Sequence, residues 1–157
     1  MTEPTNIQRA SEREFVVTRM FDAPARIVWE AWTRPELMKR WWVPKSMPMT
    51  LRSLDMDVRV GGGYRLVFGD EGSEGMAFVG QYTEVEPPAR LVWTNEEETD
   101  GSVTTVTFEE RDGRTLVTVS ELYPSKEALE KNHGAEEGLP EQFGQLDQLL
   151  ADLAREG

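Results

Sequence analysis

The sequence predicts an α+β domain in which a curved antiparallel β-sheet wraps around one long C-terminal α-helix, with two short helices after the first strand. Two patterns lead to this fold class. Segments that alternate apolar and polar residues, separated by Gly- and Pro-containing turns, run through the middle of the chain. An apolar stripe with helical spacing follows near the C-terminus. Each element has one apolar face, and laying the helix across the sheet removes both faces from water.

The first part of the chain is predicted to form a tail, a strand and two short helices. Residues 1–11 show no periodicity and are expected to be a flexible tail before a single domain over residues 12–157. Residues 13–21 alternate as a strand does. Asp22 is placed to cap the next helix, and Pro35 begins another. The apolar face of the first helix consists of Ile27, Val28, Ala31 and Trp32.

A meander of strands is predicted in the middle of the chain. Gly61-Gly62-Gly63, Pro87-Pro88 and Asp112-Gly113 are typical of the short turns that join antiparallel strands. The predicted strands are residues 50–56, 63–68, 76–85, 90–95, 102–109 and 115–122.

An amphipathic helix is predicted from Leu139 onward, after a polar loop that contains the only histidine, His133. Its apolar stripe is Leu139, Phe143, Leu146, Leu149, Leu150 and Leu153, and its polar face carries Glu141, Gln145, Gln148 and Asp152. A curved sheet cannot contact a straight helix along its whole length. We therefore expect a cavity between the two.

Composition and charge exclude several classes of function. The formal net charge is −12 with an isoelectric point near 4.6, a field that repels nucleic acids and anionic membrane surfaces. No apolar run has the length of a membrane span or the character of a signal peptide, so a cytoplasmic protein without membrane insertion is predicted. One histidine and no cysteine exclude disulfides and supply too few ligands for a metal site, and we expect neither a metal nor a cofactor.

Several strings of residues resemble one known family. They are Phe21-Asp22-Ala23-Pro24, Trp29 and Trp32, Arg40-Trp41-Trp42, and the stretch from Gly61-Gly62-Gly63-Tyr64-Arg65 through Gly80-Gln81-Tyr82 to Trp93. The chain resembles the SRPBCC superfamily from residue 15 to residue 153, and within it the homologues of the activator of the heat-shock-protein-90 ATPase. The resemblance implies the helix-grip (START-like) fold. One such scaffold serves many functions.

Aromatic and thioether side chains are the candidates for lining the expected cavity, because flat rings and flexible Met adapt to an apolar ligand. Strand parity places Met76, Phe78, Gly80 and Tyr82 on one face. The candidate residues are Trp41, Trp42, Tyr64, Leu66, Phe68, Met76, Phe78, Tyr82, Trp93, Phe143 and Leu146. Arg65 and Glu121 are polar candidates, unless they face solvent on the outer side of the sheet. The alternative is that these side chains fill a dry core.

The adjacent Trp41 and Trp42 cannot point the same way, so one is expected to fill the core and the other to line an entrance. The resemblance implies that this segment lies at the open end of the grip. Met47, Pro48 and Met49 suit a gate there, or form an ordinary surface loop.

Three functions follow from these observations. The first is binding of a small hydrophobic or amphipathic molecule in the cavity. The second, implied by the resemblance, is a chaperone partner with a role in the stress response. The third is a cyclase- or hydrolase-like enzyme that uses Tyr82, Glu121 or Arg65, although the chain has no catalytic triad or nucleophile elbow. An exposed outer sheet face also allows a homodimer.

Overall fold

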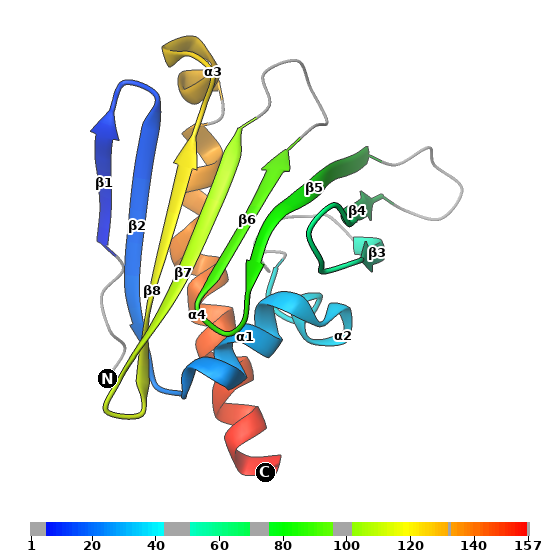
Figure 1. Cartoon of the computed structure of the whole chain (residues 1–157), viewed down its shortest axis with the longest axis vertical. Coiled ribbons are helices and arrows are strands. Elements are labelled where there is room, and N and C mark those ends of the chain that lie inside the picture. Colours follow the sequence, from blue (N-terminus) through cyan, green and yellow to red (C-terminus); the bar gives the residue numbers. More distant parts are fainter. Residues whose placement is uncertain (1–5, 43–50, 70–75, 96–101, 132, 157) are drawn as a thin grey trace.

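The computed structural model describes residues 6–42, 51–69, 76–95, 102–131 and 133–156 and confirms the predicted helix-grip architecture (Figure 1). Within these residues the antiparallel sheet has eight strands in the order β1-β2-β8-β7-β6-β5-β4-β3. The strands are β1 (Asn6–Ser11), β2 (Glu14–Phe21), β3 (Leu51–Met56), β4 (Gly63–Phe68), β5 (Met76–Glu86), β6 (Arg90–Asn95), β7 (Val103–Arg111) and β8 (Arg114–Leu122). The helices are α1 (Ala25–Thr33), α2 (Pro35–Met38), α3 (Lys126–Lys131) and α4 (His133–Glu156).

The predicted meander is confirmed from β3 to β8, where each strand pairs with the next one along the chain. The strand that opens the domain, β2, then pairs with β8, so that Val17 lies opposite Val119. This pairing places the strand before α1 beside the last strand of the sheet. It places α4 close to the strand from which the domain starts.

The N-terminal segment differs from its prediction, because Asn6–Ser11 forms β1 and is not a loose tail. Asn6 lies opposite Thr18 of β2, and Arg9 lies opposite Phe15. Only Ile7 is half-buried in β1 and the other side chains are exposed. Backbone hydrogen bonds to the edge of β2 hold this strand in place. Because its side chains are mostly exposed, its sequence shows no alternation of apolar and polar residues that would predict a strand.

The cap of α1 also differs from its prediction. The backbone N–H of Ala25 donates a hydrogen bond of 2.8 Å to the carboxylate of Glu110, which belongs to β7. Asp22 is exposed, and its carboxylate lies 4.0 Å from Arg114. A carboxylate at the first turn satisfies a free N–H group and complements the helix dipole. Glu110 of β7 therefore caps the N-terminus of α1, a role that the sequence had assigned to Asp22.

The last helix begins at His133, before the predicted start at Leu139, and a further short helix, α3, precedes it. The Ser125 hydroxyl accepts a 3.1 Å hydrogen bond from the backbone N–H of Ala128 near the start of α3. Ala128 and Leu129 are buried. The histidine thus belongs to a helix and not to a polar loop.

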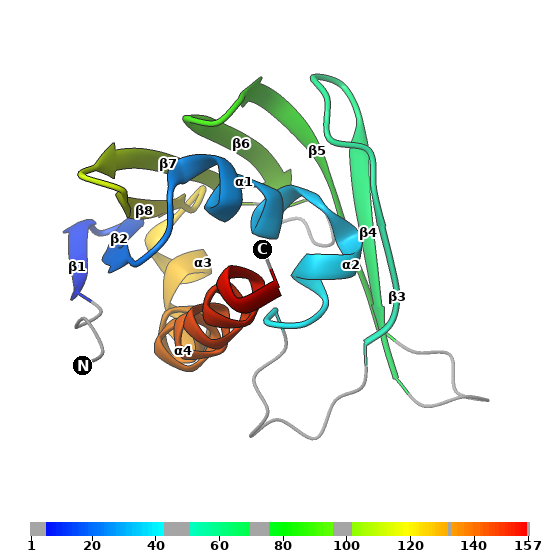
Figure 2. The ribbon, with the colours of Figure 1, turned by 90° about the horizontal axis from the view of Figure 1, so that it is seen from below.

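The sheet curves strongly on the side of β3, β4 and β5 (Figure 2). The ladder between β5 and β6 is irregular between Tyr82 and Glu84, and that between β3 and β4 is irregular between Leu51 and Ser53. Such irregularities bend a strand and increase its twist. Helix α4 lies against α1 and β2, while α2 packs against β3 at the other side of the curve (Figure 2).

Candidate functional site

An aromatic cluster fills the concave side of the sheet, with Trp32 of α1 at its centre. The Trp32 ring centroid lies 4.8 Å from that of Trp41, 6.2 Å from that of Trp93 and 6.0 Å from that of Phe108. Most of the ring pairs are edge-to-face, the arrangement that aromatic quadrupoles favour. The members of this cluster are Phe21, Trp29, Trp32, Trp41, Trp42, Tyr64, Tyr82, Trp93, Phe108 and Phe143.

Three neighbouring strands contribute one end of the aromatic cluster. Tyr64 of β4 lies 6.0 Å from Tyr82 of β5 and 6.5 Å from Trp93 of β6, measured between ring centroids. Tyr64 lies over its cross-strand partner Gly80. A Cβ atom on Gly80 would lie 2.5 Å from the Tyr64 ring and 1.8 Å from the Thr94 carbonyl oxygen, so only glycine fits there.

Burial changes the acid–base behaviour of one ring in this cluster. Tyr82 is buried, and its desolvation raises the pKa of the phenol above its ordinary value, because an apolar surrounding disfavours the charged phenolate. Tyr82 therefore stays neutral to a higher pH than an exposed tyrosine does.

Two glutamines of α4 hold the tryptophan pair. The side-chain amide of Gln145 donates a 3.0 Å hydrogen bond to the carbonyl oxygen of Trp41, and that of Gln142 donates to the carbonyl oxygen of Trp42. The Trp41 indole donates to the Ala31 carbonyl oxygen at 2.9 Å. Trp41 is completely buried and Trp42 is half-buried, so the two point differently, as the sequence predicts.

The indole N–H of Trp32 has no hydrogen-bond partner in the described part of the chain, although Trp32 is 1% exposed. An unsatisfied buried donor costs free energy. Among the described residues, the Trp32 Nε1 atom is the one buried side-chain N or O atom without a hydrogen-bond partner.

A buried arginine, which the sequence analysis did not single out, links the sheet to α4. Arg19 of β2 is 3% exposed and shares the inner face of the strand with Phe15, Val17 and Phe21. Its guanidinium donates a 2.9 Å hydrogen bond to the Phe143 carbonyl oxygen and another to the Asp147 carboxylate. It also lies over the Phe21 ring, 4.7 Å from the centroid. The signal in the sequence is a cation on the parity of the buried strand residues.

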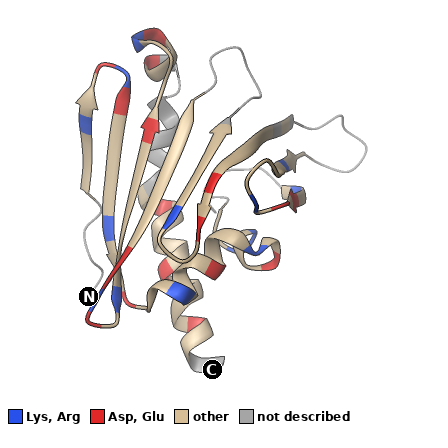
Figure 3. Ribbon diagram, viewed as in Figure 1, with Lys and Arg blue, Asp and Glu red and all other residues tan. Residues whose placement is uncertain are grey.

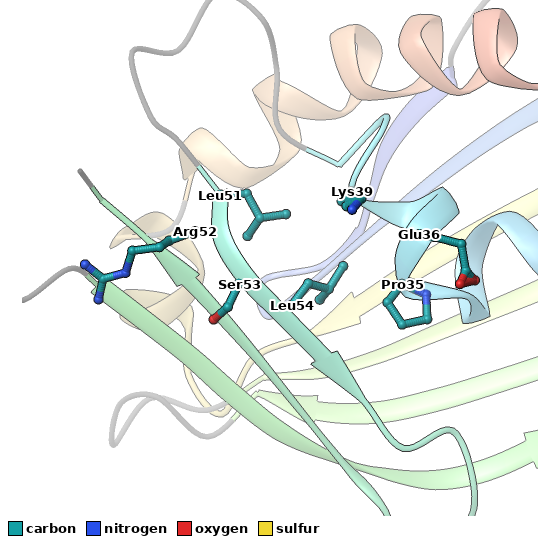
Figure 4. A pocket seen from close by; sticks show the side chains of 7 residues that line it. All are labelled: Pro35, Glu36, Lys39, Leu51, Arg52, Ser53 and Leu54. Atoms are coloured by element: carbon teal, nitrogen blue, oxygen red, sulfur yellow. The ribbon is translucent and has the colours of Figure 1, made fainter. Parts of the chain in front are cut away.

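A pocket of about 370 Å³ opens between α2 and β3 (Figure 4). Leu51 and Leu54 point from β3 toward α2, whereas the Arg52 guanidinium points away from it (Figure 4). Leu54 packs against the buried core. The lining residues are Pro35, Glu36, Lys39, Leu51, Arg52, Ser53 and Leu54. Sequence reasoning missed them, because the strand irregularity next to Leu51 breaks the alternation that would have marked an inner face.

Six of the residues predicted to line the cavity belong to the aromatic cluster, namely Trp41, Trp42, Tyr64, Tyr82, Trp93 and Phe143. Buried among all the predicted lining residues are Trp41, Leu66, Phe68, Tyr82, Trp93, Phe143 and Leu146, while Trp42 and Tyr64 are half-buried. The side chains of Met76 and Phe78 lie outside the described part of the structure, as do Met47, Pro48 and Met49.

The two polar candidates lie apart from each other. Arg65 is exposed, on the opposite parity of β4 from Tyr64 and Leu66. Glu121 is half-buried on β8 and accepts a hydrogen bond from the Thr104 hydroxyl.

Two further features concern metals and membranes. Among the described residues, no group of three or more His, Cys, Asp or Glu side chains is placed to hold a metal ion. None of the helices in the described segments combines the length and apolarity needed to cross a bilayer.

Residues 22–151 match the family model described as "Activator of Hsp90 ATPase homolog 1-like protein". Among solved structures, the chain is similar to a protein from Nitrosomonas europaea, with 25% identity and a TM-score of 0.80 over 92% of this chain and 98% of that one. A protein from Mycobacterium smegmatis has 28% identity and a TM-score of 0.79, over 94% and 97% of the two chains. A protein from Rhodobacter sphaeroides, at 24% identity, shares the fold with a TM-score of 0.84 over 96% and 99%. No curated protein matches the chain significantly.

Proposed function

The chain belongs to the family of Activator of Hsp90 ATPase homolog 1-like proteins, and within this family we propose that it is a binding module for an apolar or amphipathic small molecule. The ligand occupies the pocket between α2 and β3. The observation that carries the proposal is this pocket, whose volume of about 370 Å³ is in the range of small-molecule sites, roughly 300–1,000 Å³.

The packing partners of the helices support this location. The main partners of α4 are α1 and β2, while α2 is the helix that packs against β3. Half-buried apolar side chains therefore remain along β3, β4 and the connection between them at the margin of the core: Leu54, Met56, Val58 and Tyr64. An apolar ligand beside Leu51 and Leu54 would extend this layer. Burial of about 150 Å² of apolar ligand surface stabilises a complex by about 4 kcal/mol before the costs of association.

The proposal places the ligand at the end of the grip where the tryptophan pair lies, and not under α4. Arg19 and the glutamines Gln142 and Gln145 tie α4 to β2 and to the tryptophan segment. The rings around Trp32 already contact one another. The aromatic cluster is then part of the packed core, and the pocket, which is lined by residues outside the cluster, takes the ligand.

The test is an NMR titration of ¹⁵N-labelled protein with 1-octanol. Saturable shifts of the amide signals of Lys39, Leu51 and Leu54 are expected. The variant Leu51→Trp, which fills the pocket, should lose the binding and keep the fold. Val60→Trp is the control, because Val60 is 66% exposed and does not line the pocket. Saturation in L51W equal to that of the parent protein would refute the pocket as the site.

The description of the matching family favours a second candidate function, stimulation of a heat-shock ATPase. The expected outcome is an increased ATP turnover of such a heat-shock ATPase when this protein is added. An unchanged turnover at a protein concentration that saturates a pull-down, or the absence of any pull-down, would end this candidate.

A further inference from the structure

We propose that the ligand of the α2–β3 pocket carries an anionic head group, and that the Lys39 ammonium group binds it. This inference rests on the proposed function, since it names the chemical class of the small molecule. The ligand is a single-chain amphiphile whose apolar body lies on Leu51 and Leu54, with its anionic oxygens at Lys39.

The charge around α2 differs in sign from that of the whole chain. The protein has a formal net charge of −12, yet residues of both signs stand around α2 (Figure 3), with Arg34, Lys39 and Arg40 against the carboxylates of Glu36 and Asp152. An overall negative field repels anions. A local excess of cations at the mouth of a pocket is therefore the place where an anionic group is tolerated.

Four of these five charged side chains are paired with one another. The Arg34 guanidinium lies 3.1 Å from the Glu36 carboxylate, and the Arg40 guanidinium lies 3.7 Å from that of Asp152. Lys39 has no ion pair with any of the described residues, although many other described cations are paired. Its ammonium group is thus available to a ligand.

The geometry of the pocket places this cation opposite the apolar wall. Lys39 lies across the pocket from Leu51, and the Glu36 side chain points away from both leucines (Figure 4). Lysine keeps its charged end in water while its aliphatic stem lies on an apolar surface. One side chain can therefore contact both parts of an amphiphile. Two leucines facing a cation that has no ion pair among the described residues suit a chain with one anionic end.

The experiment compares ligands with the same octyl chain and different head groups, again by NMR titration. The probes are octanoate, octyl phosphate, 1-octanol and octyltrimethylammonium, all below their micellar concentrations. In the parent protein the anionic probes are expected to bind about three- to tenfold more tightly than 1-octanol, the range of a partly exposed charge-assisted contact. Raising the salt concentration should reduce this preference, since screening weakens the contact.

The variant Lys39→Met retains the aliphatic stem and removes the charge. It is expected to bind octanoate as weakly as 1-octanol, with unchanged affinity for 1-octanol. Lys126→Met is the matched control, because Lys126 is an exposed lysine of α3 that does not line the pocket, and it should preserve the preference.

The outcomes distinguish a failure of the head-group inference from a failure of the proposed function. Equal binding of octanoate and 1-octanol by the parent would overturn the head-group inference and leave the proposed function standing. A preference for anions that survives in K39M would overturn the assignment to Lys39. Failure of all four probes to bind would overturn the proposed function itself. If octyl phosphate and octanoate differ, both support an anionic head group, and the tighter one identifies it as a phosphate or a carboxylate.

Discussion

Arg19 and Asp147, 128 residues apart in the sequence, form an ion pair that joins β2 to α4. The Arg19 side chain is 2% exposed and that of Asp147 is 32% exposed, so the cation lies much deeper than the anion. One turn earlier in α4, the Phe143 carbonyl oxygen accepts a second hydrogen bond from the same guanidinium. The pair therefore fixes the position of α4 along β2. It is asymmetric in burial, because the arginine is buried and the aspartate is partly exposed.

This asymmetry leads to the first prediction. Asp147→Ala leaves a buried guanidinium without its carboxylate and is expected to lower the free energy of unfolding by about 2 to 3 kcal/mol. The control is Asp152→Ala in the same helix, whose partner Arg40 is exposed, with an expected loss below about 1 kcal/mol. Arg19→Met should cost less than D147A, because water can reach the Asp147 carboxylate that remains. Urea denaturation measures all three, and a loss in D147A no larger than in D152A would contradict the proposed role of the pair.

The second prediction concerns Gly80. Gly80→Ala is expected to lower the free energy of unfolding by about 2 to 3 kcal/mol, because the added Cβ meets the Thr94 carbonyl oxygen and the Tyr64 ring. Gly144→Ala in α4 is the control, since a Cβ there meets nothing within 4 Å. Alanine in a helix interior should raise the stability by about 0.5 to 1 kcal/mol. A loss of stability in G80A no larger than any loss in G144A would show that the contacts at Gly80 do not destabilise the variant.

The third prediction separates the two candidate caps of α1. Glu110→Ala removes the acceptor of the Ala25 N–H and is expected to cost about 1 kcal/mol. Asp22→Ala should change the stability by less than about 0.5 kcal/mol, since Asp22 is exposed and makes only a distant contact with Arg114. Thermal unfolding followed by circular dichroism compares them. The reverse order of the two losses would restore Asp22 as the cap.

The fourth prediction is a pH dependence that arises from Tyr82. Burial raises the pKa of this phenol in the folded protein, so between its ordinary pKa and the folded one the unfolded chain has lost a proton that the folded protein keeps. Stability is therefore fully present below about pH 10, the ordinary pKa of tyrosine, and falls as the pH rises above it. The slope is at most about 1.4 kcal/mol per pH unit from this group.

The matching variant is Tyr82→Phe, which removes the ionisable group and keeps the ring. Its unfolding free energy should decline less steeply than that of the parent between about pH 10 and pH 11. Parallel declines in the two proteins would mean that another group causes the loss of stability at high pH.

The sequence by itself determined the parts of the fold that depend on local patterns. The alternation in residues 63–68 and 90–95 predicted β4 and β6 with their observed bounds, and the stripe from Phe143 to Leu153 predicted the body of α4. These periods of two and of 3.6 residues express which face of an element meets the core, and this information lies within a few neighbouring residues. The resemblance to the family rests on the same segments.

Only the tertiary structure decided the contacts between residues far apart in the chain. The edge of β2 orders β1, Glu110 reaches the start of α1 from β7, and Asp147 reaches Arg19 from α4. The pocket between α2 and β3 depends on the curvature that the irregular ladders of β3 and β5 impose on the sheet. A periodic pattern states that a side chain faces inward but not which side chain it meets, because partners are chosen by the packing of the whole chain.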